Sequence, residues 1–84
     1  MRIERDFVTS KFEEFMVDND FTLKVTRHCY HAELTLFIEV RILELNMLSL
    51  TGETEQEAVL NLTRAISDQV IITKKGNYIK VPRF

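Results

Sequence analysis

Polar and apolar residues alternate strictly along residues 33–42, and this pattern restricts the fold more than any other feature of the chain. The apolar set is Leu34, Leu36, Ile38, Val40 and Ile42; the set between them is Glu33, Thr35, Phe37, Glu39 and Arg41. Because successive side chains of a strand point to opposite faces, the pattern predicts a half-buried strand. The apolar parity changes near 42–43, which one straight strand cannot follow. We therefore expect a bulge or turn at 43–46, with Asn46 as the turn residue, and a third strand over about 46–50.

Helical spacing appears on both sides of this region. Residues 10–13 form a capping box before apolar residues at helical spacing, which predicts a helix over about 10–18. Residues 54–57 form a second capping box, which predicts a helix over about 54–68. Its expected core stripe is Ala58, Val59, Leu62, Ala65, Ile66 and Val70.

The remaining segments read as strands. Residues 21–26 alternate in polarity and predict a strand, with residues 27–31 as its connection to the next one. Residues 70–73 and 78–81 flank a turn at Gly76-Asn77 and predict a hairpin. The expected architecture is an α+β fold, an antiparallel sheet packed by two helices in the order α-β-β-β-α-β-β, with 1–84 as a single domain.

Hydropathy and cysteine content predict where in the cell the protein is located. No apolar run reaches the roughly 18 residues that a membrane span requires. Residues 1–6 lack the apolar core of a signal peptide, and Cys29 has no second cysteine to bond. We expect a cytoplasmic protein that has no contact with a membrane.

Residues 28–31 hold the one cluster of metal-ligating side chains, namely His28, Cys29 and His31. A structural zinc site needs four convergent ligands, so we expect a plain loop; a metal shared across a dimer is the weaker alternative. A cysteine–histidine nucleophile pair would also need an orienting group and an oxyanion site. No glycine-rich phosphate loop is present. We therefore expect no catalytic residue, no cofactor and no metal.

The side chains of Phe37, Glu39 and Arg41 are expected on the polar face of the strand over 33–42. An aromatic residue there has two readings: helices cover part of the face, or Phe37 is exposed in a contact with a partner. The second reading rests on the enrichment of aromatic residues at binding hot spots.

Charge is distributed unevenly along the chain. Residues 1–70 hold all 13 acidic residues and 7 of the 11 basic residues, whereas the basic residues of 71–84 stand without an acid. These bases are Lys74, Lys75, Lys80 and Arg83. They either protect an edge strand or form a contact surface, where Tyr78 would stack on a nucleic-acid base.

Residues 48–66 resemble the HicB-like antitoxins. The likeness lies in a strand, then Gly52-Glu53-Thr54, then a helix with Glu57-Ala58 and a closing Ala65-Ile66. The resemblance implies a sheet-and-helix domain that binds and blocks another protein, such as a ribonuclease toxin, and it implies no catalytic residue. The chain departs from that family in its N-terminal helix and in the missing Tyr-Pro opening and Pro-Gly turn.

The order α-β-β-β-α also matches the double-stranded RNA-binding domain. That family opens its second helix with lysines, whereas this chain has Glu53, Glu55 and Glu57 there. Acidic residues at that position repel a polyanion, so the topology is expected without the function.

These observations predict a small non-enzymatic protein-binding module. We expect an inhibitor or antitoxin-like regulator, either HicB-like or encoded by a phage or mobile element. Its partner would be a nuclease or another host enzyme. A homodimer is expected because open sheet edges on a thin core favour pairing. The alternative is a nucleic-acid-binding protein that uses the basic hairpin.

Overall fold

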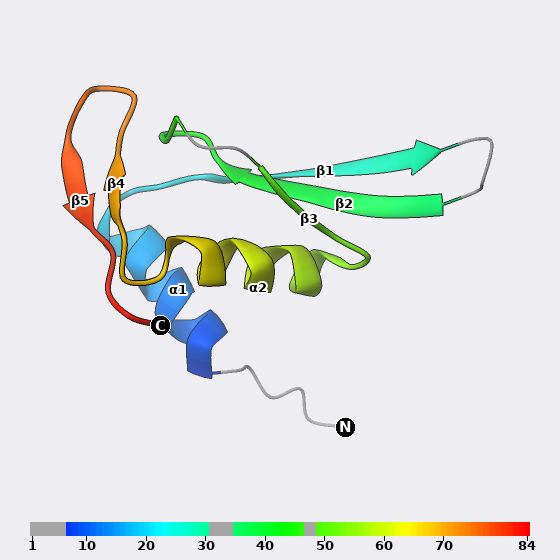
Figure 1. Ribbon diagram of the computed structural model, residues 1–84, viewed down its shortest axis with the longest axis horizontal. Helices are drawn as coiled ribbons and strands as arrows, with labels where there is room; N and C mark the ends of the chain where they lie inside the picture. The colour runs from blue at the N-terminus through cyan, green and yellow to red at the C-terminus, as the bar shows by residue number, and fades with distance from the viewer. Residues whose placement is uncertain (1–6, 31–34, 47–48) are drawn as a thin grey trace.

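The computed structural model describes residues 7–30, 35–46 and 49–84 and has an α+β fold. The elements are α1 (Phe7–Asp18), β1 (Leu23–Tyr30), β2 (Thr35–Ile42), β3 (Leu50–Gly52), α2 (Glu55–Ile66), β4 (Val70–Ile72) and β5 (Tyr78–Lys80). The predicted order α-β-β-β-α-β-β is confirmed (Figure 1). Neither helix in the described ranges has the length and apolar character needed to cross a membrane.

The strands form two antiparallel sheets. In the first, β2 lies between β1 and β3, with Leu23 opposite Ile42 and Tyr30 opposite Thr35 along the β1–β2 hairpin. In the second, β4 pairs with β5. A β-bridge between Leu45 and Thr73 joins the region after β2 to the β4–β5 hairpin.

Helix α2 packs against β2 and β3, and this contact forms the centre of the core (Figure 1). Val40 and Ile42 of β2 are fully buried, as is Leu62 of α2. Gly52 allows close approach, because a Cβ at this position would lie 2.5 Å from the backbone nitrogen of Ala58. The inner face of the sheet is therefore defined as the face that α2 covers, and the outer face as the opposite one.

Helix α1 is attached by aromatic side chains. Phe12 and Phe15 are buried and each meets the C-terminal Phe84 edge to face, with ring centroids 6.0 and 5.8 Å apart respectively. Phe15 also meets Phe21 at 5.8 Å. The Phe84 amide donates to Ser67 Oγ at 2.9 Å, which secures the end of the chain beside both helices.

The long hairpin differs from the prediction at three points. Strand β1 continues to Tyr30, so the predicted connection at 27–31 was wrong for residues 27–30, and His31 lies outside the described residues. The expected turn after β2 is present, but it is formed at residues 43–44, and Asn46 lies beyond it. The third strand is Leu50–Gly52 instead of 46–50, and residues 47–48 are outside the described ranges.

Both predicted helices are present with shifted ends. Helix α1 begins before the predicted cap Ser10, which lies inside it. The second cap is confirmed, because Thr54 Oγ1 accepts a hydrogen bond from the Glu57 amide at 3.0 Å. The stripe was wrong at Ala65, which is exposed, and at Val70, which belongs to β4.

Candidate functional site

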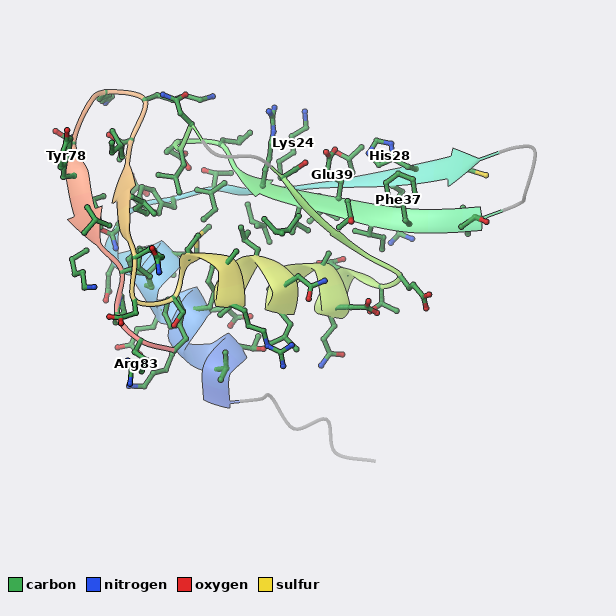
Figure 2. The ribbon with its side chains drawn as sticks, in the orientation of Figure 1. Lys24, His28, Phe37, Glu39, Tyr78 and Arg83 are labelled. Carbon is green, nitrogen blue, oxygen red and sulfur yellow. The ribbon has the colours of Figure 1, made fainter. Side chains whose placement is uncertain are left out.

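The outer face of the β1–β2–β3 sheet is the candidate site. Among the described residues, both helices lie on the other side of the sheet or at its end (Figure 1). Figure 2 shows Lys24, His28, Phe37 and Glu39 projecting together from this outer face. Phe37 and Glu39 are half-buried while Arg41 is exposed, although α2 does not reach them.

Cross-strand contacts organise the centre of this face. His28 of β1 lies opposite Phe37 of β2, and the two rings stack with centroids 4.7 Å apart and planes 15° from parallel. His28 Nε2 lies 3.1 Å from Glu39 Oε1. The other oxygen of Glu39, Oε2, accepts a hydrogen bond from the Ser49 hydroxyl. Stacking and hydrogen bonding therefore hold an aromatic, an imidazole and a carboxylate in one arrangement.

The three polar groups lie in an order that suits binding. Glu39 stands between Ser49 and His28, so the imidazole does not contact the hydroxyl whose proton a serine nucleophile would lose. The hydrogen bond from Ser49, followed by that with His28, lowers the pKa of the Glu39 carboxyl from its ordinary value. A carboxylate with a lowered pKa is a weaker proton acceptor at neutral pH. The cluster presents fixed charge and aromatic surface.

Two basic side chains follow on the same face. Lys24 lies directly opposite Arg41 in the β1–β2 register, and both are exposed. Like charges directly opposite one another destabilise a strand pair. Arg41 acts on Glu39 at longer range and lowers the pKa of its carboxyl slightly further. The pair therefore places positive charge on the outer face, next to the Thr26–Glu39 pair in the register.

The basic C-terminal segment is neutralised in part by one acid outside it. Lys80 Nζ donates to the Asp68 backbone oxygen at 2.8 Å and to its Oδ1 at 3.0 Å. Arg83 Nη2 lies 3.5 Å from Asp68 Oδ2. The hydrogen bond from Lys80 is the main reason why the pKa of the Asp68 carboxyl is lowered. Two of the four candidate bases thus serve as structural partners of the turn after α2.

The other basic residues lie at the tip of the β4–β5 hairpin. The Lys74 amide donates to the Glu44 carbonyl at 2.8 Å, and the Glu44 carboxylate accepts from the Thr22 amide at 2.6 Å. Lys75 is exposed, and Tyr78 has 75% of its surface exposed on the outside of β5 (Figure 2). The structure does not bring these residues to the outer face of the first sheet, so the sequence-predicted site residues fall into two separate groups.

The metal candidates do not converge. His28 and Cys29 are neighbours in β1, so their side chains point to opposite faces of the sheet. His31 is outside the described residues. Within the described part of the chain, the structure contains no group of three histidine, cysteine or acidic side chains able to hold a metal ion.

Sequence reasoning missed His28, Lys24 and Ser49 as members of the outer face. Strand periodicity contains a signal for two of them. If the strand predicted over 21–26 continues to residue 30, the side chains of Lys24 and His28 lie on the same face. Hydropathy gave no sign that the strand continues to residue 30, because residues 27–30 lie beyond α2 and need no apolar face. Ser49 enters through the tertiary pairing of β3 with β2.

No family model, curated protein or solved structure matched this chain in the comparisons with known proteins.

Proposed function

We propose that this protein is a binding module that acts on another protein through the outer face of the β1–β2–β3 sheet. The observation that carries the proposal is the His28–Phe37 stack with Glu39 held beside it, on a face that the described helices leave open. A half-buried aromatic ring next to fixed charged groups resembles the centre of an interface, where aromatic and charged anchors contribute most of the binding energy.

The proposed partner is a protein. The outer face carries the Glu39 carboxylate at its centre, which would repel a phosphate backbone there, and the basic pair Lys24 and Arg41 at its margin. In the basic hairpin, the proposed alternative site for nucleic acid, Lys80 and Arg83 are engaged by Asp68. Both observations favour a protein surface over a polyanion.

The mode of action we propose is inhibition or antitoxin-like regulation. Support comes from the resemblance of residues 48–66 to HicB-like antitoxins and from the acidic balance of residues 1–70, which complements a basic nuclease. A phage or mobile-element origin fits the same role. The lone cysteine supports a cytoplasmic setting. A homodimer remains a prediction that light scattering over a range of concentrations would test.

The test is affinity capture from host lysate with the whole chain as bait at physiological salt. We expect a retained protein whose amount falls at least about ten-fold with Phe37→Ala, the loss typical of a hot-spot truncation. Val17→Ala is the matched control, because Val17 is 79% exposed on α1 and away from the outer face. Capture that is equal for both variants, or no capture by the unmodified chain, would contradict the proposal.

A further inference from the structure

Strand β1 has a pairing partner on one side only. It pairs with β2 along its whole length of 8 residues, and no other described strand lies against it. The Leu43 amide donates to the Thr22 carbonyl at 2.9 Å, so residues 22 and 43 form a hydrogen-bonded pair. Because such pairs alternate along an antiparallel ladder, Lys24, Thr26 and His28 also face β2. The backbone groups of Val25, Arg27 and Cys29 therefore point away from the sheet, along an open edge.

The side chains along this edge form a definite chemical pattern. Strand β1 contains Lys24 and Arg27 and no acidic residue. Both bases are exposed, and neither forms an ion pair with a described residue. Arg41 lies directly opposite Lys24 on the outer face and adds to the positive charge there.

The inner face beside this edge is incompletely covered and carries apolar side chains on both sides of the exposed Arg27. Helix α2 packs on β2 and β3, which leaves Val25 37% exposed and Leu36 66% exposed near the free end of the hairpin. Val25 and Leu36 belong to the same inner face. A strand added beside β1 would cover Val25 with its own apolar side chains, next to Arg27 on the same face.

We propose that the open edge of β1 binds an extended acidic segment of a partner protein by strand addition. The partner would carry acidic side chains toward Lys24 and Arg41 on the outer face and apolar side chains toward Val25 on the inner face. Its main chain would bond to the free groups of Val25, Arg27 and Cys29. This inference rests on the proposed function and names the partner's chemistry at the margin of the same face.

A second copy of the chain is the less suitable occupant of this edge. Antiparallel pairing of β1 with itself would bring Lys24 and Arg27 of both copies into one short ladder without an acid. Directly opposed like charges destabilise strand pairs, and lysines on an edge strand oppose self-association. The charge of β1 therefore selects an acidic partner.

A synthetic peptide tests the inference on the whole protein. The probe is an extended peptide of about seven residues in which glutamate and valine alternate, a typical strand length. We expect a saturable titration by nuclear magnetic resonance in which the amide protons of Val25, Arg27 and Cys29 become protected from exchange. The same peptide with lysine in place of glutamate is expected not to bind.

Two N-methylated peptides separate strand addition from simple charge attraction. In an antiparallel added strand, the valines on the inner face form the hydrogen-bonded pairs with Val25 and Arg27. Methylation of every valine nitrogen is therefore expected to abolish binding, whereas methylation of every glutamate nitrogen is tolerated. Equal binding by both methylated peptides would overturn the inference.

Charge variants of the protein complete the test. We expect Lys24→Gln to weaken peptide binding about two- to five-fold, the range of an exposed ion pair. Arg27→Gln should weaken it less, because the Arg27 side chain lies on the inner face, beside the valines of the peptide. Arg64→Gln on α2 is the matched control and is expected to leave binding unchanged, since Arg64 is exposed outside the edge. An equal effect of all three substitutions would contradict a site at β1.

The outcomes separate this inference from the proposed function. If no peptide binds but lysate capture still depends on Phe37, the edge inference fails and the outer face stands. If the peptide binds while capture is absent, the edge stands and the proposed function fails. Protection of the β1 amides in the protein alone that disappears on dilution would assign the edge to a second copy and overturn the inference.

Discussion

The two faces of the β1–β2–β3 sheet are stabilised in different ways. On the inner face, Val40 and Ile42 are buried against Ala58 and Leu62 of α2, and shape complementarity determines their positions. On the outer face, side chains touch mainly across strands, through ring stacking and hydrogen bonds that remain accessible to water. The inner face therefore carries most of the stability. The outer face contributes less to stability and remains accessible for recognition.

The largest effect is expected on the inner side, from Leu62→Ala. Leu62 is fully buried, so removal of its side chain leaves a cavity that the surrounding core cannot fill. We expect the free energy of unfolding to fall by about 2–5 kcal/mol, measured by urea denaturation. Val17→Ala, on an exposed helix position, should change it by less than about 0.5 kcal/mol. Equal losses for the two variants would contradict the assignment of the inner face.

The close approach of β3 to α2 predicts the next effect. In Gly52→Ala, the new methyl group would lie 2.5 Å from the Ala58 nitrogen, and backbone on both sides must move. We expect a loss of about 1–3 kcal/mol in unfolding free energy. Thr51→Ala changes the neighbouring residue, which is exposed opposite Glu39, and should cost less. A larger loss of unfolding free energy for Thr51→Ala than for Gly52→Ala would contradict the conclusion that the inner face carries most of the stability.

Phe37→Ala should produce a smaller loss, of about 1–2 kcal/mol, because Phe37 is half-buried and its ring stacks on His28. A double-mutant cycle with His28→Ala measures the stack itself, for which we expect a coupling of about 0.5–1.5 kcal/mol. Additive losses would show that the two rings do not interact in solution.

Lys24→Glu is expected to raise stability. The substitution replaces a like-charge pair with an opposite-charge pair facing Arg41 in the cross-strand register. We expect a gain of about 0.2–1 kcal/mol in thermal or urea unfolding, together with weaker binding of the acidic peptide. A variant that is more stable but binds the peptide less well would show that Lys24 serves binding at the expense of stability. A loss of stability would argue against the register or the exposure of the pair.

The smallest effects should appear in the pH dependence of stability. The pKa of each of the Glu39, Glu44 and Asp68 carboxyls is lowered in the folded chain, chiefly by hydrogen bonds from Ser49, the Thr22 amide and Lys80 respectively. A lowered pKa means that the stabilisation is present at neutral pH and is lost as pH falls through about 4 and below. Urea midpoints should therefore decrease from pH 7 to pH 3.

Two substitutions assign this acid dependence to residues. Glu39→Gln and Asp68→Asn should each make the decrease in urea midpoint shallower than in the unmodified chain. Asparagine suits position 68 because Asp68 has φ of 62°, a left-handed conformation that asparagine tolerates. An unchanged slope in both variants would show that these carboxyls titrate alike in the folded and unfolded chains.

Local patterns predicted most of the elements. The cap at Thr54, the spacing of Leu62 and Ile66 and the alternation along β2 are short-range signals, and each corresponds to an observed element. The alternation of polar and apolar residues did not predict a strand at 27–30. The β1–β2 hairpin extends beyond α2 there, so neither face of β1 requires an apolar residue. Hydrophobic periodicity reports which side of a strand is buried, so it carries no signal where both sides meet water.

The candidate site was predicted in part. Phe37, Glu39 and Arg41 were placed together on the polar face of β2, and the structure agrees. Their partners were not predictable, because His28 and Ser49 reach Glu39 through strand register, at separations of 11 and 10 residues. The charge run at 71–84 was a poorer guide, since the Asp68 that binds Lys80 and Arg83 lies just outside it.

The sequence by itself determined the α+β class, the order of the elements and the polar character of one side of β2, because periodicity, caps and turns act over a few residues. Only the tertiary structure decided which positive charges are compensated. It bonds Lys80 to Asp68 and leaves Lys24 facing Arg41 beside an open edge. The physical reason is that ion pairs and strand registers depend on distances in space, and a charge count along the chain contains no such distances.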